Sequence, residues 1–369
     1  MKKFLVVGFA CLMVACSNNH SNYIVETIDI NKCFENNQLD LVRKNYAYDG
    51  FVVKLETNDD CLLRMGGDFY FSNERIFIKQ NTIYIFDFNG KYINKLKIGN
   101  GYGEIAQVRA VDFDAEINEL VVFQKPYVKY YSPDGVFLRE KEVQYSFSDI
   151  KAIEGGYILQ SDAGYMQCKE KPNATLLYVD KEFNLISAHF EKIEKAICYD
   201  MQRVYYDQSA KKAIIPNRND TIYCLDNKQL TPKYLLDYST CRFDYSINNI
   251  ETWFAEEAKR YEWWYYFETS THQFFGLTKG GLGCNIFRDK FNGKLLSGVY
   301  YDINALFNVT PLATYGDYFV SIKSQTEIDG ELEKLDLFAA EDLAKIHNQA
   351  PEDNPLLIFF KLKPFDNEE

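Results

Sequence analysis

A hairpin signal that recurs along the chain constrains its fold more than any other feature. Asn89-Gly90 and Asp134-Gly135 each lie between two apolar, aromatic runs. Asn-Gly or Asp-Gly in that setting is the strongest short-range sign of a β-hairpin. The two glycines are 45 positions apart. The chain is therefore expected to consist of repeated units of strands.

Three further units continue this series. Aligning the turns brings Gly90, Gly135, Asn184, Gln229 and Gly293 into register, with steps of 45, 49, 45 and 64 residues. One or two additional strand-like runs precede most of these hairpins. Four strands in about 40–50 residues are typical of a propeller blade. Five hairpins and the stretch 299–363 predict an all-β chain folded as a six-bladed β-propeller of four-stranded antiparallel blades, one domain over 23–369.

Two amphipathic stretches interrupt the strand pattern. In 246–262, apolar residues such as Ile250 and Phe254 recur at helical spacing, which explains the long step of 64. We expect a helix inserted between blades, with its apolar stripe capping the propeller. A second helix is predicted over 330–349.

A propeller ring is usually closed by an N-terminal strand that pairs with the last blade, which leaves no exposed edge. The alternating run 24–30 is the candidate for this strand, and 355–363 is its expected neighbour. The run 51–55 is predicted to be a further strand, which lies before the first repeat.

The N-terminus has the pattern of a processing signal. Lys2 and Lys3 precede an apolar run over 4–14 that is too short to span a bilayer. The run ends in Ala15-Cys16, so we expect 1–15 to be a signal peptide, Cys16 to carry lipid, and 16–22 to form a tether. The alternatives are an ordinary secretory signal or a chance cysteine.

Composition excludes some partners. The formal net charge is −12, and it becomes −14 once Lys2 and Lys3 leave with the signal. A surface this acidic argues against binding to nucleic acid and against binding to anionic lipid through a polybasic segment. Of nine cysteines, seven remain after Cys11 and Cys16 are set aside, and no CxxC pair occurs, so neither a zinc site nor a cofactor is expected.

The chain resembles the six-bladed, TolB-like β-propeller lipoproteins of Gram-negative bacteria. The matching stretches are Ala15-Cys16, 52–57 (VVKLET), 83–91 (IYIFDFNGK), 99–104 (GNGYGE), 219–223 (NDTIY) and 353–363 (DNPLLIFFKLK). The family usually has Pro where Tyr102 stands and Tyr where Ile105 stands. The resemblance implies a propeller that is lipid-anchored in the cell envelope, on the periplasmic side or the outer-membrane surface. It assigns no reaction, because most of the family is uncharacterised.

The loop 99–104 is the candidate binding site. A phosphate-binding loop needs a following helix, and a strand-like run follows here instead. The structural interpretation is an inter-blade loop that needs positive φ at glycine. The functional interpretation places the loop at one end of the propeller's central channel. Tyr102, Glu104 and Arg109 would then contact a polar ligand or a partner.

The function expected from these observations is that of a binding or scaffold module for an envelope protein or a glycan, without catalysis. The four histidines lie far apart, and no GxSxG or HExxH motif occurs. The first alternative is a glycan hydrolase or lyase with its site at the channel mouth, since a fold alone does not decide function. The second is a glycan sensor that stacks sugars on 263–267, although aromatic residues there would also fill a blade interface.

Overall fold

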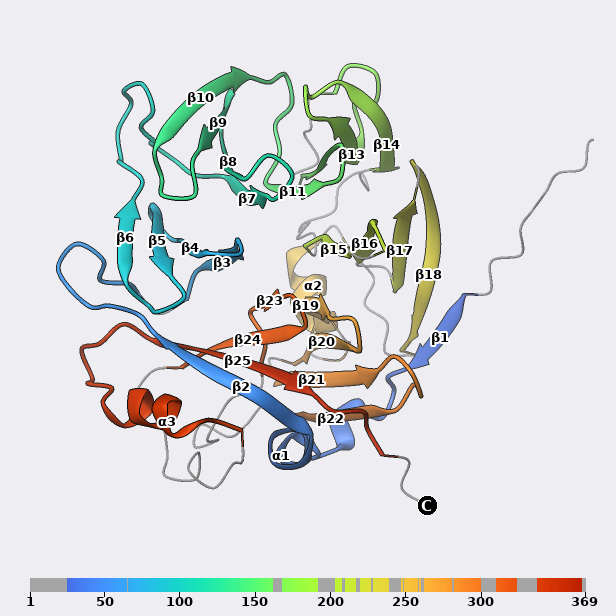
Figure 1. Cartoon of the computed structure of the whole chain (residues 1–369). Coiled ribbons are helices and arrows are strands. Elements are labelled where there is room, and N and C mark those ends of the chain that lie inside the picture. The colour runs from blue at the N-terminus through green and yellow to red at the C-terminus, as the bar shows by residue number, and fades with distance from the viewer. Residues whose placement is uncertain are drawn as a thin grey trace, which may run out of the picture.

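Six sheets stand around a common axis and form the predicted β-propeller (Figure 1). The structure is a computed structural model. It describes residues 25–64, 66–161, 168–191, 203–207, 210–216, 220–226, 228–238, 247, 249–257, 259, 262–280, 282–299, 310–323 and 337–366. Cys16 and the expected signal peptide lie outside these residues.

Blades one to three follow each other along the chain, and each runs from the axis outward. Blade one contains β3 (Asp68–Phe71), β4 (Arg75–Lys79), β5 (Ile83–Asp87) and β6 (Tyr92–Lys95). Blade two contains β7 (Ala110–Asp114), β8 (Glu119–Gln124), β9 (Tyr127–Tyr131) and β10 (Phe137–Glu142). Blade three contains β11 (Asp149–Ile153), β12 (Gly156–Gln160), β13 (Ala174–Asp180) and β14 (Leu185–Glu191).

Blades four to six complete the ring and take up two strands from the N-terminal segment. Blade four contains β15 (Tyr205–Asp207), β16 (Lys212–Pro216), β17 (Thr221–Asp226) and β18 (Gln229–Asp237), with β1 (Glu26–Asp29) outside them. Blade five contains β19 (Glu262–Glu268), β20 (His272–Lys279), β21 (Leu282–Asp289) and β22 (Leu295–Val299). Blade six contains β23 (Ala313–Tyr315), β24 (Tyr318–Lys323), β25 (Leu356–Leu362) and β2 (Ala47–Lys54).

All five predicted hairpins are confirmed, and each joins the third and fourth strands of a blade. Gly90, Gly135 and Gly293 have φ values of 83°, 80° and 75°, a region that glycine enters without steric cost. At the other two turns the positive φ falls on Phe183 and Lys228, each one residue before the aligned position.

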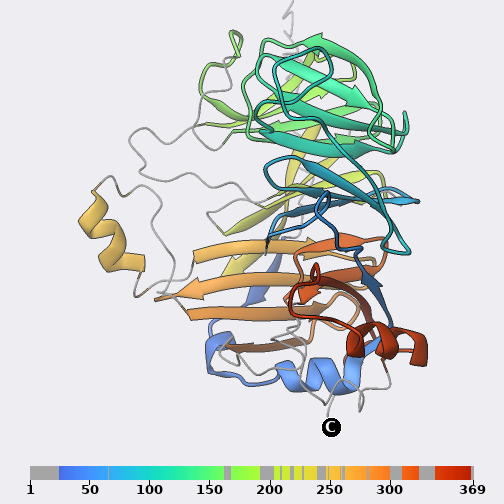
Figure 2. The ribbon, with the colours of Figure 1, turned by 90° about the vertical axis from the view of Figure 1, so that its left-hand side faces the viewer.

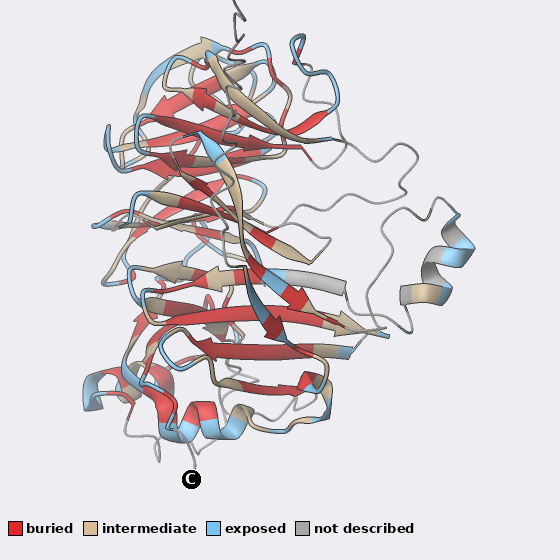
Figure 3. Ribbon diagram, turned by 90° about the vertical axis from the view of Figure 1, so that its right-hand side faces the viewer, coloured by how far each residue is buried: buried red, intermediate tan, exposed pale blue. Residues whose placement is uncertain are grey.

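The core lies between the blades. Six clusters of buried apolar side chains each join two neighbouring blades, so every interface around the ring is filled. Phe77, Phe123 and Phe274 are among the fully buried aromatic rings. Figure 3 shows the buried residues along the strands. Aromatic residues make up 16% of the chain. Layers of this kind account for them, because large rings fill the wedge between two twisted sheets.

The ring is closed by β2, so the prediction for 24–30 is wrong. Strand β2 pairs antiparallel with β25, whereas β1 pairs parallel with β18 in blade four. The reason lies in burial. Only Ile28 of β1 is buried, whereas Val52 and Val53 of β2 point to opposite sides and are both buried. A near-continuous apolar run fits a strand that is covered on both faces.

Residues 25–54, which we call the strap, therefore cross the outside of three blades. Between its two strands lie η1 (Cys33–Glu35), α1 (Leu39–Leu41) and η2 (Val42–Tyr46). This part follows the outermost strand of blade five, where the Gln38 amide donates to the Ser297 carbonyl at 2.9 Å. Figure 1 shows the strap in blue, from β1 past α1 to β2.

Both predicted helices occur, and both are shorter than expected. Helix α2 (Ile250–Glu257) stands apart from the blades in Figures 2 and 3, so it does not cap the ring as we expected. Helix α3 (Ala340–His347) begins late, and 330–336 lie outside the described residues. It packs on the closing strand, because the Val52 amide donates to Asp342 Oδ1 at 3.1 Å. Among the described helices, none has the length and apolarity that a membrane crossing requires.

The cysteines act as small apolar residues in the described part of the chain. Cys33, Cys61, Cys168 and Cys284 are buried, Cys224 is half-buried, and all five are free thiols. Cys198 and Cys241 lie outside the described residues.

Candidate functional site

The two faces of the ring differ in the length of the segments that connect the strands there. Because all blades have the same antiparallel order, the innermost strand of every blade begins at one face, which we call the loop face. The longest connections leave from this face: 161–173, 192–204, 238–261, 300–312 and 324–355. The opposite face, the turn face, carries short turns such as 72–74, 181–184 and 316–317. Binding residues collect on long loops that a rigid scaffold positions, so the loop face is the first place to look.

Two of the three predicted site residues lie at the outer rim of the ring. The Tyr102 ring is 80% exposed and packs edge-on against Phe137 of the outermost strand β10, with the ring centroids 4.7 Å apart. Glu104 forms an ion pair with Lys97 and accepts a hydrogen bond from the Gly101 amide at 2.9 Å. The hydrogen bond from Lys97 lowers the pKa of Glu104, with the Gly101 amide adding to it. Glu104 therefore holds its own loop together.

The glycines of this loop are explained by close approach. A Cβ at Gly99 would lie 2.0 Å from Glu104 Oε2, and a Cβ at Gly103 would lie 2.7 Å from Phe137 Cγ. Gly103 also has a φ of 75°. A Cβ at Gly101 would lie 2.9 Å from Glu104 Oε2. Close approach thus accounts for all three glycines, and the binding role of Tyr102 and Glu104 stays a prediction.

Arg109 lies elsewhere. It directly precedes β7, the innermost strand of blade two, and is exposed. Its carbonyl accepts a hydrogen bond from Lys79 Nζ at 3.0 Å. The connection from β6 to β7 runs from the rim to the axis (Figure 1). Arg109 lies at its inner end, directly before β7, whereas Tyr102 packs against the outermost strand β10.

Around the axis, the loop face carries a cluster of polar side chains from three blades, which we call the axial cluster. It consists of Asp68, Tyr70 and Lys79 of blade one, Asp149 of blade three, and Arg203 just before blade four. Asp68 forms ion pairs with Arg203 and with Lys79, the latter at 3.2 Å. The Arg203 guanidinium carbon lies 5.6 Å from the centroid of the Tyr70 ring. One arginine thus bridges an acid and an aromatic ring.

The electrostatics of the two acids differ. Burial alone would raise the pKa of Asp68, but Arg203 and Lys79 outweigh it and lower that pKa. Burial raises the pKa of Asp149, and the nearby charge of Asp112 adds to this while Arg203 opposes it. Asp112 itself pairs with Lys151 at 3.1 Å. The cluster therefore offers the Asp68 carboxylate, whose ionised form is stabilised, and the Arg203 guanidinium. It also offers the Asp149 carboxyl group, whose ionised form is disfavoured.

This arrangement suits the recognition of a polar partner. Guanidinium and carboxyl groups supply directional hydrogen bonds, and the Tyr70 ring lies against the Arg203 guanidinium and helps to hold it in place. Within the described ranges, no group of three or more His, Cys, Asp or Glu side chains is placed to hold a metal ion.

No sequence pattern pointed directly to the axial cluster, because Asp68, Asp149 and Arg203 are far apart in the chain. A usable signal did exist. Asp68 and Asp149 are the first residues of innermost strands, so an alignment of first strands, instead of hairpins, would have brought them together. The aromatic run 263–267 is in part a packing feature. Tyr266 is buried and donates its hydroxyl to Glu268, while Tyr265 is 39% exposed. The side chains of Trp263 and Trp264 lie outside the described residues.

Comparison with known proteins gives a family and a fold. The family described as "Domain of unknown function (DUF4934)" matches residues 25–361, and the chain belongs to it. A solved protein of Bacteroides fragilis, described as exported, is similar with a TM-score of 0.70 and 18% identity, over 92% of this chain and 99% of that one. A comparison with curated proteins finds no match.

Two more distant structures are similar at lower scores. BamB from Moraxella catarrhalis has a TM-score of 0.43 and 9% identity, over 74% of this chain and 84% of that one. A protein of unknown function from Bacteroides caccae has a TM-score of 0.39 and 9% identity, over 65% of this chain and 89% of that one.

Proposed function

We propose that this member of the DUF4934 family is a non-catalytic binding module of the cell envelope, which holds a protein or glycan partner on its loop face. The observation that carries the proposal is the coincidence of the axial cluster with the longest connections on one face of the ring. Rigid blades position such loops, and the loops provide the variable contact surface.

The charges near the axis favour a polar partner. Arg203 is bound to Asp68, but Arg109 is exposed and forms no ion pair within the described residues. In a chain with a net charge of −12, an uncompensated arginine beside the axis is a local attraction for a carboxylate or another anionic group. Such a group is common to acidic protein loops and acidic glycans.

Attachment to the membrane is the second part of the proposal. Cys16 would carry the lipid, and the similarity to an exported protein supports a place in the envelope of a Gram-negative bacterium. The first strand, β1, begins at Glu26, so about nine residues separate Cys16 from the ring. Such a tether spans roughly 30 Å when extended, which would keep the ring close to the membrane surface.

Partner capture tests the binding surface. The soluble chain would be immobilised, and proteins and glycans from detergent-solubilised envelope would be quantified on wild type and on Arg109→Glu. We expect at least a fivefold loss of the captured partner. Lys91→Glu on the turn face is the matched control, because Lys91 is also exposed and the charge change is the same. Equal capture by both variants, with unchanged melting, would remove the loop face from the proposal.

Lipid attachment has its own test. Cys16→Ser should abolish labelling by a fatty-acid probe and release the protein from the membrane fraction. A variant that labels and sediments like wild type would show that Cys16 is not the attachment site, and partner capture would be unaffected by that result.

A further inference from the structure

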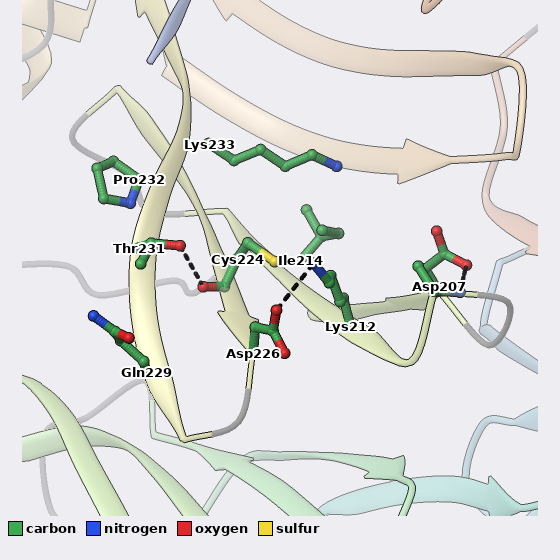
Figure 4. A pocket seen from close by; sticks show the side chains of 10 residues that line it. Asp207, Lys212, Ile214, Cys224, Asp226, Gln229, Thr231, Pro232 and Lys233 are labelled. Atoms are coloured by element: carbon green, nitrogen blue, oxygen red, sulfur yellow. Dashed lines mark hydrogen bonds and ion pairs between the residues drawn. The ribbon is translucent and has the colours of Figure 1, made fainter. Parts of the chain in front are cut away.

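A pocket of about 420 Å³ opens in blade four, away from the axial cluster. Its lining comes from all four regular strands of the blade, and Figure 4 shows Lys212, Cys224, Asp226, Thr231 and Lys233 around it. The volume lies in the range of small-molecule sites. Lys233 reaches from this pocket to Glu268 of blade five, so the pocket borders the interface between blades four and five.

A β-bulge sets the position of Lys233. Strand β17 pairs Ile222 with Tyr234 and Tyr223 with Pro232, which leaves Lys233 as an extra residue without a partner in the ladder. A bulge of this kind turns a side chain away from the regular alternation, and bulges are frequent at functional sites. Proline at the preceding position has no amide hydrogen to lose there. The local backbone thus aims the ammonium group of Lys233.

The charges around Lys233 do not balance on that side of the pocket. Its Nζ lies 3.5 Å from Glu268 Oε1, but Lys290 Nζ lies 2.6 Å from the same oxygen. Glu268 also accepts the hydroxyl of Tyr266 and is only 1% exposed. Two ammonium groups therefore share one buried carboxylate, so Glu268 neutralises Lys233 only in part.

The other charges of the pocket limit what can bind. Lys212 and Asp226 neutralise each other across 2.9 Å. Asp207 also lines the pocket, and its Oδ1 accepts the Ala210 amide at 3.0 Å. Asp207 is a second carboxylate beside that of Asp226. It would repel a ligand with two negative charges more strongly than a ligand with one. Thr231 and Gln229 offer hydrogen bonds, while Ile214 and Pro232 form an apolar wall.

We propose that this pocket binds a small hydroxylated monocarboxylate, with its carboxylate against Lys233 and its hydroxyl groups toward Thr231, Gln229 and Asp207. A uronic acid has this chemistry: one negative charge, several hydroxyl groups and an apolar ring face for Ile214 and Pro232. The proposal stands apart from the partner surface of the loop face, since none of its residues belongs to the axial cluster.

A calorimetric titration of the purified chain with D-glucuronate tests the proposal. D-glucose is the uncharged control ligand. We expect saturable binding of glucuronate and at least tenfold weaker binding of glucose. Lys233→Met should weaken glucuronate binding at least tenfold, and Lys233→Arg should retain most of it. Lys228→Met is the matched control in the adjacent turn, because Lys228 is exposed and does not line the pocket.

A second readout covers the case in which Lys233→Met does not fold. Glucuronate should slow alkylation of Cys224 in the wild-type chain, since the thiol lines the same pocket, and glucose should not. The proposal is overturned if glucuronate does not bind saturably, if Lys233→Met binds it as wild type does, or if Cys224 is not protected.

Discussion

The walls between the blades and the loop face of the ring are built from different residues. In the walls, Phe77, Phe123 and Phe274 lie completely buried in clusters that join neighbouring sheets. On the loop face, Asp68, Asp149 and Arg203 bring charges of both signs together around the axis. The walls are held by apolar area removed from water, and the loop face is free to present polar groups. Stability and binding can therefore be tested separately in this fold.

The largest effect is expected in the wall at the ring closure. Val53 of β2 is 1% exposed and pairs with Leu357 in the cluster between blades six and one. Val53→Asp would bury an unpaired charge, and we expect a loss of roughly 4 kcal/mol or more in the free energy of unfolding. Chemical denaturation measures the loss.

Tyr48→Asp is the control for that substitution, because Tyr48 lies on the same strand and is 36% exposed. It should cost much less. If Val53→Asp unfolds at the same denaturant concentration as wild type, β2 does not close the ring.

A smaller effect is expected from one buried histidine in the wall. His272 is fully buried, its ring lies 4.8 Å from Phe365, and its Nδ1 is 2.9 Å from Thr271 Oγ1. Burial lowers the pKa of His272 to about 4, Lys290 adds to this, and Asp289 opposes it. The unfolded chain therefore takes up a proton near pH 6.5, where the folded chain does not.

The contribution of His272 to stability is thus complete above pH 6.5 and is lost as the pH falls toward 4. It amounts to about 3 kcal/mol. His272→Phe should remove this component, which is measured as the difference between the two curves of unfolding free energy against pH. Parallel curves between pH 6.5 and 4 would show that His272 is not held neutral in the folded chain.

The strap provides the smallest of these effects. Glu26 of β1 forms an ion pair with Arg288, which is buried and also donates to Gln273 Oε1 at 2.8 Å. Glu26 is half-exposed, so water screens the pair, and Glu26→Gln should cost about 1 kcal/mol. Glu74→Gln, at an exposed position of blade one, is the control. A loss as large as that of Val53→Asp would mean that β1, and not only β2, holds the ring closed.

The sequence was sufficient to predict the fold because the hairpin turns repeat. Glycine at positive φ marked three of the five turns, and alternating apolar runs marked the strands beside them. The closure could not be assigned in the same way, since 24–30 and 51–55 both look like strands. Only the burial of both faces of β2 separates them, and burial depends on which neighbours the fold provides.

The candidate site was harder to predict than the fold. Gly99, Gly101 and Gly103 attracted attention as a possible ligand loop, although their small size serves contacts with Glu104 and Phe137. Of the predicted residues, only Arg109 lies near the axis. The axial cluster depends on strands from different blades, and spacing along the chain carries no information about that proximity. The pocket beside Lys233 depends on a β-bulge in strand β18, which no residue pattern in the sequence predicted.

Whether a partner binds on the loop face can be measured by comparing the two faces of the ring in the intact envelope. A photo-activated cross-linking amino acid would replace Arg109 on the loop face, or Phe291, which is 76% exposed in the turn between β21 and β22 on the turn face. After irradiation of cells, adducts would be measured as mass shifts of the purified chain. We expect a discrete adduct from position 109 and none from position 291. Equal adducts from both positions, or an adduct from position 291 alone, would contradict a partner surface on the loop face.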